Sequence, residues 1–186
     1  MQILFLALGL VGFIITIFGA RWNFRSFQTK EIIGFSIIEL EKEFVIKKPG
    51  LFTICIIGGG YLNNNDNFRI LVKSKENQKV IDLKENCIKP RFRRNCKIGI
   101  EYRQFSISDS GIYKVEIENV KDLIVKKSML KTKQIFQSPL PIKNIEVLIK
   151  ETIPISKKLL GIVFFILGLN MFFWGIILGV TPELFG

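Results

Sequence analysis

Two long apolar runs enclose a stretch in which apolar and polar residues alternate. The first run, Ile3 to Ala20, has no charged residue over 18 positions, and the second, Leu159 to Val180, has one strongly polar side chain, Asn170, in 22. A helix rises about 1.5 Å per residue, so runs of this length approach or reach the ~30 Å of a bilayer's hydrocarbon core. The pattern predicts transmembrane helices at 1–20 and 159–180.

The N-terminal run has a second interpretation, a cleaved secretion signal. Such peptides have a basic start and small residues before the cleavage site. Here no Lys or Arg precedes the apolar run, and Phe18 stands at the third position before a cut after Ala20. We therefore expect an uncleaved signal anchor, with cleavage as the alternative.

Between the two runs the apolar spacing changes to a period of two. Phe44 to Ile56 and Phe105 to Ile117 match position for position, with Phe first, Ile two later, Gly six later, then an aromatic and two β-branched residues at steps of two. This spacing places each apolar set on one face of a strand, and the Gly, which follows Pro49 or Ser110, suits a turn. Each copy is predicted to form strand, tight turn, strand.

Further alternating runs predict more strands. They begin at Arg69, Lys79, Lys97, Val120 and Asn144. Short alternating strands with turn residues between them and no amphipathic helix indicate an antiparallel β-sandwich or barrel. The predicted fold class is mainly β, with one antiparallel β-sandwich domain (21–158) flanked by the two transmembrane helices and a short tail (181–186).

Three residues of the second copy carry a resemblance to known folds. The spacing of Asp109, Gly111 and Tyr113 is similar to the tyrosine corner of immunoglobulin-like domains, and the doubled unit resembles edges of jelly-roll domains of the GOLD and carbohydrate-binding kinds. Val115 stands where the immunoglobulin fold has a cysteine. The resemblance implies a jelly-roll or immunoglobulin-like sandwich without a particular family; the same spacing also occurs where ordinary β-turns enter a strand.

Charge and composition restrict the kinds of catalytic and metal-binding site that the protein can contain. All 27 Lys and Arg and 15 of the 16 acids lie between Arg21 and Lys158, which gives this segment a net charge of +12. Histidine is absent, which excludes Ser-His-Asp and Cys-His sites, His-ligated zinc and imidazole catalysis. The remaining acids that could act in catalysis, Glu101, Asp109 and Glu116, show no motif spacing. We expect no cofactor, no metal and no enzyme activity, with a carboxylate-dependent membrane enzyme as an alternative.

Two polar segments are candidate binding loops. Gly58 to Asn67 is predicted to be a flexible loop with an aromatic and amide set that suits glycans: Tyr61, Asn63, Asn64 and Asn65. Lys89 to Lys97 has basic residues around an aromatic one, which suits phosphate, anionic lipid head groups or an acidic partner: Lys89, Arg91, Phe92, Arg93 and Arg94. A plain loop and a solvated hairpin tip are the alternatives. Without a nucleic-acid motif, nucleic acid is not an expected partner.

The cysteines divide into two kinds. Cys55 lies within an apolar strand pattern and is expected to be buried and inert. Cys87 and Cys96 flank the basic segment, where they could close a disulfide in an oxidising compartment or remain free thiols in a reducing one.

The second apolar run contains features of a helix contact. Asn170 lies near its middle, and Gly175 and Gly179 form a GxxxG pair. An unpaired amide is costly in hydrocarbon, and glycines let two helix backbones approach closely. These residues predict contact with the first helix or with a partner chain.

Two arguments about the side of the membrane oppose each other. Lys and Arg flank the domain side of both apolar runs, which by the positive-inside rule indicates a cytosolic domain, whereas the resemblance to displayed sandwiches implies the opposite side. We expect an integral protein of the cell membrane, in a bacterium by its abundance of Lys, Ile, Asn and Phe, with the extracytoplasmic side narrowly favoured for the domain.

The expected function is that of a membrane-anchored binding or interaction module, such as an accessory subunit of a membrane complex. Its expected partners are membrane lipid, a protein or a second copy bound through the helices, and a glycan or anionic head group bound by the domain. The alternative is a structural spacer without a ligand.

Overall fold

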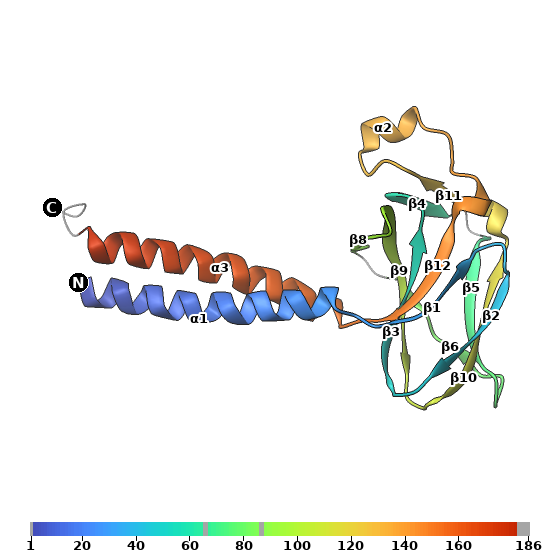
Figure 1. The fold of residues 1–186 in the computed structure, drawn as a ribbon, viewed down its shortest axis with the longest axis horizontal. Coiled ribbons are helices and arrows are strands. Elements are labelled where there is room, and N and C mark those ends of the chain that lie inside the picture. Colours follow the sequence, from blue (N-terminus) through green and yellow to red (C-terminus); the bar gives the residue numbers. More distant parts are fainter. Residues whose placement is uncertain (1, 65–66, 86–87, 182–186) are drawn as a thin grey trace. The chain divides into compact units, whose positions relative to one another are not determined.

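The structure, a computed structural model, describes residues 2–64, 67–85 and 88–181 (Figure 1). The chain divides into two compact units. The first comprises Met1–Thr29 with Ile153–Gly186, and the second is Lys30–Thr152. The first unit is a pair of helices and the second is mainly β.

The helical unit consists of α1 (Gln2–Phe27) and α3 (Ile155–Val180). Both are long and apolar enough to cross a membrane, over Gln2–Arg25 and Ile155–Val180, as the two apolar runs predicted. Both helices are longer than those runs. No Pro or Gly interrupts the chain between Ala20 and Gly34, which allows α1 to continue past the apolar residues. The helix α3 begins directly after Pro154, a residue that is tolerated at the start of a helix but not in its interior.

The second unit contains antiparallel strands and three short helices. The strands are β1 (Glu31–Ser36), β2 (Glu41–Ile46), β3 (Gly50–Ile57), β4 (Tyr61–Asn64), β5 (Arg69–Ser74), β6 (Val80–Ile81), β7 (Lys84–Glu85), β8 (Arg91–Arg94), β9 (Lys97–Ile107), β10 (Gly111–Glu118), β11 (Leu123–Lys126) and β12 (Glu146–Glu151). The short helices are η1 (Val120–Asp122), α2 (Lys131–Ile135) and η2 (Ile142–Asn144).

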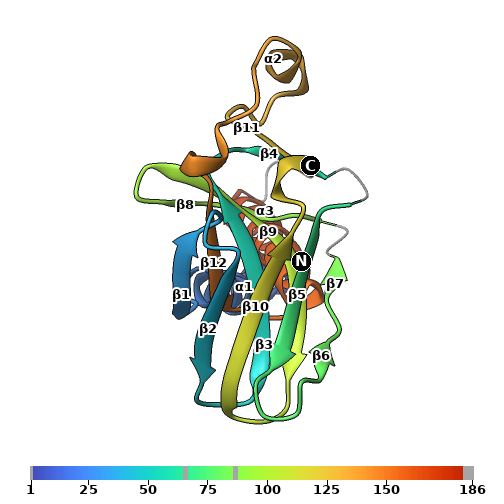
Figure 2. The same cartoon turned by 90° about the vertical axis from the view of Figure 1, so that its right-hand side faces the viewer.

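These strands form two larger sheets and one strand pair. The order in the larger sheet is β1-β12-β3-β9-β7, with β8 also paired to β9. The second sheet has the order β2-β10-β5-β6, and β11 pairs with β4 (Figure 2). The run predicted from Lys79 is divided between the sheets, since β6 pairs with β5 and β7 pairs with β9.

The two sequence copies pair with each other. Each copy leaves one sheet and enters the other, so β2 lies beside β10 while β3 lies beside β9. The first aromatic of each copy lies opposite the second aromatic of the other: Phe44 is opposite Tyr113, with ring centroids 6.1 Å apart, and Phe52 is opposite Phe105, with centroids 5.7 Å apart. The repeat is therefore a local two-fold arrangement at one end of the sheets.

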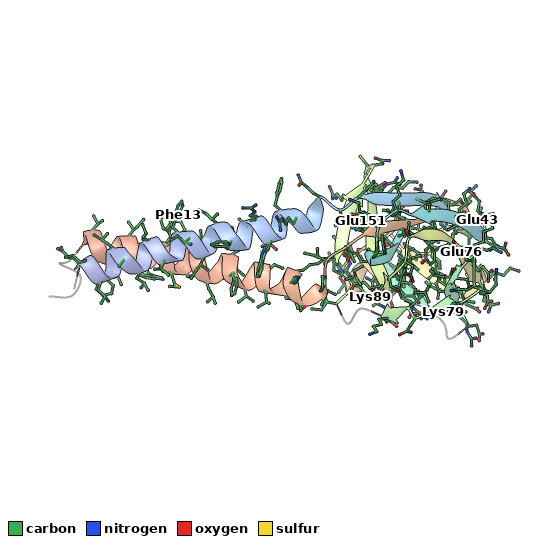
Figure 3. The ribbon with its side chains drawn as sticks, turned by 90° about the horizontal axis from the view of Figure 1, so that it is seen from below. Phe13, Glu43, Glu76, Lys79, Lys89 and Glu151 are labelled. Atoms are coloured by element: carbon green, nitrogen blue, oxygen red, sulfur yellow. The ribbon has the colours of Figure 1, made fainter. Side chains whose placement is uncertain are left out.

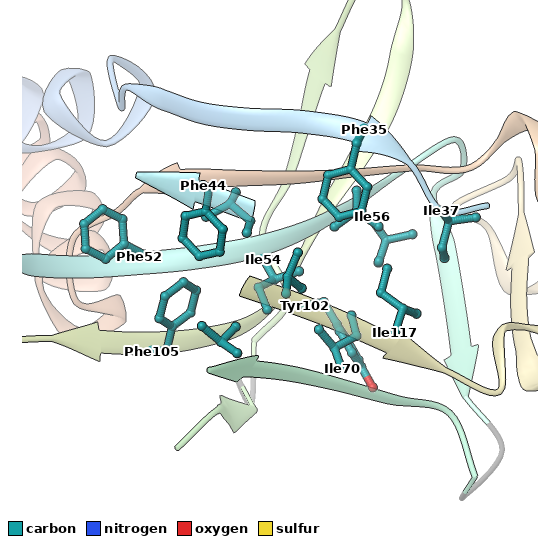
Figure 4. Packing of buried hydrophobic residues seen from close by; sticks show 14 of the residues in the cluster. Phe35, Ile37, Phe44, Phe52, Ile54, Ile56, Ile70, Tyr102, Phe105 and Ile117 are labelled. Carbon is teal, nitrogen blue, oxygen red and sulfur yellow. The ribbon is translucent and has the colours of Figure 1, made fainter. Parts of the chain in front are cut away.

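The apolar faces of both sheets supply one hydrophobic core (Figure 4). Every apolar position that the copies share is buried, as the period of two predicted: Phe44, Ile46, Phe52, Ile54, Ile56, Phe105, Ile107, Tyr113, Val115 and Ile117. Charged side chains such as Glu43, Glu76 and Lys79 are exposed at the surface (Figure 3). Tyr113 also shows the hydrogen bond of a tyrosine corner, since its hydroxyl donates to the Asp109 carbonyl oxygen (2.8 Å).

Candidate functional site

The first predicted binding segment is a strand rather than a flexible loop. Residues Tyr61–Asn64 form β4, which pairs along its length with β11. Asn63 is exposed, Tyr61 and Asn64 are half-buried, and Asn65 lies outside the described residues. The prediction of a loop was wrong because polar residues can form a strand when a distant segment supplies the backbone hydrogen bonds.

The glycines that precede β4 allow close packing. Gly58 has φ of 143°, a value that side chains disfavour. A Cβ on Gly59 would overlap the Lys126 carbonyl group, and one on Gly60 would overlap the Met129 side chain. The glycines therefore let the chain approach the end of β11 and the residues that follow it.

The second predicted segment is a β-hairpin. Arg91–Arg94 form β8, which pairs with the start of β9, and the turn is confined to Asn95 and Cys96, with φ of 48° and 61°. Positive φ at both central residues is the geometry that joins two antiparallel strands most tightly. The hairpin tip is therefore much shorter than the predicted loop.

Most of the hairpin's positive charge is paired within the domain. Arg94 Nε and Nη2 each lie 2.9 Å from an oxygen of the Glu31 carboxylate, and Lys97 forms an ion pair with Glu146. Lys89 Nζ lies 2.6 Å from Glu85 Oε1. Three of the five cations in Lys89 to Lys97 are thus paired with carboxylates from other strands, and binding of phosphate, anionic head groups or an acidic partner by this segment stays a prediction.

The hairpin also meets the other candidate segment. Arg91 Nε donates to the Gly60 carbonyl oxygen (2.8 Å), directly before Tyr61. Arg93 is exposed and has no ion pair with the described residues. The structure thus brings Arg91 next to β4, and Asn63, Arg91 and Arg93 are exposed among the described residues of the two predicted sites.

Phe92 packs on the face of the larger sheet that points away from the main hydrophobic core, rather than facing solvent. Its ring occupies the space that a Cβ on Gly99 would need, 2.5 Å from Cζ. Lys150 Nζ lies 4.0 Å from the ring centroid and 3.1 Å from Glu101 Oε1. Lys150 and Glu101 are only 7% and 3% exposed. This buried ion pair gave no sequence signal, because its members are 49 residues apart on β12 and β9.

The cysteines are placed as follows. Cys55 is fully buried on the same face of the larger sheet, beside Ile57, Leu148 and Phe92, as expected of an inert thiol. Cys96 is exposed at the hairpin turn and forms no disulfide with the described residues. Cys87 lies outside the described residues, so the Cys87 to Cys96 disulfide stays a prediction.

A groove at the β7 edge was not predicted. Its volume is about 320 Å³, and its lining includes Leu51, Asp82, Lys84 and Gln104. Gln104 is 8% exposed, and its Nε2 has no hydrogen-bond partner in the described structure. A concave site of this size can bind a small ligand, but the Gln104 Nε2 atom is itself buried and not accessible to one.

In the helical unit, glycines form the contact between α1 and α3. The buried residues of α3 are Gly161, Gly168, Gly175 and Gly179. A Cβ on Gly168 would lie 2.5 Å from Thr16 N, and one on Gly175 would overlap the Gly9 backbone. The steps of seven between Gly161, Gly168 and Gly175 were a readable signal that the GxxxG pair alone did not capture, because residues at this spacing share a helix face.

Asn170 does not lie at this contact. Its side chain is exposed, and its Nδ2 donates to the Ile166 carbonyl oxygen of its own helix (2.8 Å). The alternative in which Asn170 contacts the first helix was therefore wrong, since the glycine seam occupies a different face. Contact with a partner chain stays a prediction.

Comparisons with known proteins add no family. The chain matches no protein-family model, and no curated protein matches its sequence. The class that the structure supports is a mainly β, antiparallel domain joined to two long apolar helices.

Proposed function

We propose that this chain is a membrane-anchored β-sandwich that acts as an interaction module, such as an accessory subunit of a membrane complex. In this proposal α1 and α3 cross the cell membrane as one glycine-packed pair. Two antiparallel sheets with one shared core support the sandwich assignment, of jelly-roll or immunoglobulin-like type. The protein associates with another chain through α3.

The observation that carries this proposal is the exposure of Asn170. Asn170 Nδ2 donates one N–H to the Ile166 carbonyl oxygen of its own helix, and its second N–H and its Oδ1 are costly in lipid unless they meet another polar group. Around Asn170 lies a stripe of exposed apolar side chains at helical spacing: Ile166, Leu167, Phe173, Trp174 and Ile177. Since α1 covers the glycine face, this second face is free to pack against a helix of another protein or of a second copy.

Replacing Asn170 by leucine is expected to weaken this association by about 3- to 30-fold, the effect of roughly 0.6–2 kcal/mol from one interhelical hydrogen bond. Asn170→Gln, which keeps the amide, is the matched control and should retain most of the association. The measurement is co-purification in mild detergent, together with single-molecule counting in bilayers to separate a second copy from another protein. Association that is the same in the leucine variant would contradict the proposal.

The enzyme alternative loses support from the positions of its carboxylates. Glu101 lies buried next to Lys150, and hydrogen bonds from Lys73 and Lys114 lower the pKa of Glu116. A general acid at neutral pH needs a raised pKa, so Glu116 does not suit that role. The spacer alternative differs in having no partner, which the co-purification also tests.

The side of the membrane can be read from Cys96. With the domain outside the cytoplasm, a membrane-impermeant maleimide should label Cys96 in intact cells that express a Cys87→Ser chain, since Cys55 is buried and Cys96 is exposed. Labelling that requires cell lysis would place the domain in the cytosol. The native chain with and without mild reduction then reports whether Cys87 and Cys96 form a disulfide.

A further inference from the structure

The segment 127–139, named here the α2 lobe, stands off from the sheets (Figures 1 and 2). It leaves the domain after β11 and returns where Leu140 N donates to the Val125 carbonyl oxygen (2.7 Å). Nothing in the period-two pattern predicted it, and the short helix α2 lies at its outer end.

Polar groups hold the lobe together from within. Gln134 is only 8% exposed, and its Nε2 donates to the Ser128 carbonyl oxygen (3.2 Å). Lys126 Nζ donates to the Gln134 carbonyl oxygen (2.7 Å), and Ser128 N donates to Gln137 Oε1 (2.9 Å). These bonds close the lobe as a small structured loop.

The apolar side chains of the lobe face outward. Exposed fractions are 49% for Met129, 59% for Leu130, 78% for Ile135 and 90% for Phe136. A polar interior with an apolar exterior is the reverse of the usual arrangement in water, and a concentrated exposed apolar patch marks an interaction site.

The charge around this patch has a single sign. From Leu123 to Ile145 there is no Asp or Glu, and the segment contains Lys126, Lys127, Lys131, Lys133 and Lys143. Lys127 and Lys133 are exposed. Apolar side chains flanked by lysines suit the boundary between anionic head groups and acyl chains. There the apolar side chains are buried among the acyl chains, while the lysines are attracted to the negative head groups.

The covalent connections to α1 and α3 keep the β-rich unit close to a membrane that these helices cross. Both ends of the β-rich unit, Lys30 and Thr152, lie within a few residues of α1 and α3. A folded domain of this length has a radius of gyration of about 14 Å, so its loops stay within a few tens of ångströms of the bilayer that holds the helices.

We propose that the α2 lobe inserts Met129, Leu130, Ile135 and Phe136 into the interface of an anionic bilayer. The inference rests on the membrane anchoring in the proposed function and adds a second, peripheral membrane contact. Anionic lipid is the proposed partner because all the charged residues that accompany the patch are positive.

The test uses the full chain in liposomes and the fluorescence of a single tryptophan. A W22F/W174F/F136W chain reports the lobe, and a W22F chain reports Trp174, which is exposed on α3. Lipids brominated along the acyl chain quench tryptophan only on contact. In liposomes with anionic lipid we expect quenching of both chains, with blue-shifted emission for F136W, and in zwitterionic liposomes at least twofold less quenching for F136W alone.

Each outcome decides a separate point. Quenching of Trp174 without quenching of F136W would overturn the lobe inference and leave the membrane anchor intact. Blue-shifted F136W emission without quenching would also overturn it and would indicate that the lobe packs against protein, such as a second copy of the chain. No quenching of Trp174 would contradict the anchor itself. An I135W chain repeats the measurement at a second exposed position, and K127Q/K133Q should reduce lobe quenching in anionic liposomes while leaving Trp174 unchanged.

Discussion

Replacing Gly168 by valine is expected to separate α1 from α3. Any Cβ at this position would lie 2.5 Å from Thr16 N, 2.7 Å from Thr16 Oγ1 and 2.8 Å from the Gly12 carbonyl oxygen. Two of these atoms belong to helix backbone, which cannot rotate aside as a flexible side chain does. The α1 to α3 contact should lose at least about 3 kcal/mol, the upper end of ordinary overpacking costs.

The measurement is disulfide cross-linking between the helices. Because the rings of Phe13 and Phe172 meet between the helices, with centroids 5.4 Å apart, an F13C/F172C chain should cross-link more readily with Gly168 than with valine. Leu167→Val, on an exposed position of the same helix, is the matched control. If cross-linking is equal in all three chains, the glycine seam does not hold the pair. Asn170→Leu should leave this cross-link unchanged, because it acts on a different face.

Replacing Lys150 by methionine is expected to destabilise the β-rich unit by about 3–5 kcal/mol. Glu101 is 3% exposed and its carboxylate lies 3.1 Å from Lys150 Nζ, so removal of the ammonium leaves a buried charge without that compensation. The lost contact with the Phe92 ring adds to the effect. A double variant, Lys150→Met with Glu101→Leu, should recover most of the lost stability, because it removes both charges and keeps apolar volume.

Urea unfolding of the full chain in detergent, followed by the far-ultraviolet β signal, measures this change. The control is Lys75→Met, which removes a 2.9 Å pair with Glu43 whose two side chains are each about half exposed, and it should change the free energy of unfolding by no more than about 1 kcal/mol. Equal effects of the two single variants, or no recovery in the double variant, would show that the buried pair does not behave as proposed.

The candidate site shows which features a sequence can reveal. The basic residues of Lys89 to Lys97 were visible as a cluster, but their partners Glu31 and Glu146 come from β1 and β12. The same holds for β4, whose strand character depends on β11, with paired residues 59 to 65 positions apart in the chain. Ion pairs and strand pairs between distant segments have no fixed sequence spacing, so no local sequence pattern predicts them.

For the helices, the sequence shows which residues are present but not which face of α3 packs against α1. The sequence placed Asn170 near the middle of an apolar run, and it contained glycines at steps of seven. Which face α1 covers became clear only from the packed pair, in which the glycines face inward and Asn170 outward. Because Asn170 faces away from α1, the general prediction of a helix contact becomes a specific proposal, that Asn170 contacts another chain.

The sequence by itself determined the two apolar helices, the mainly β class and the buried face of the repeated unit, because hydrophobic period and length are local properties of the chain. Only the tertiary structure decided how the two copies pair, which cations are neutralised, that Lys150 and Glu101 share a buried site, and that the α2 lobe exposes its apolar side chains. Those outcomes depend on which distant segments meet, and burial and electrostatics act only after they have met.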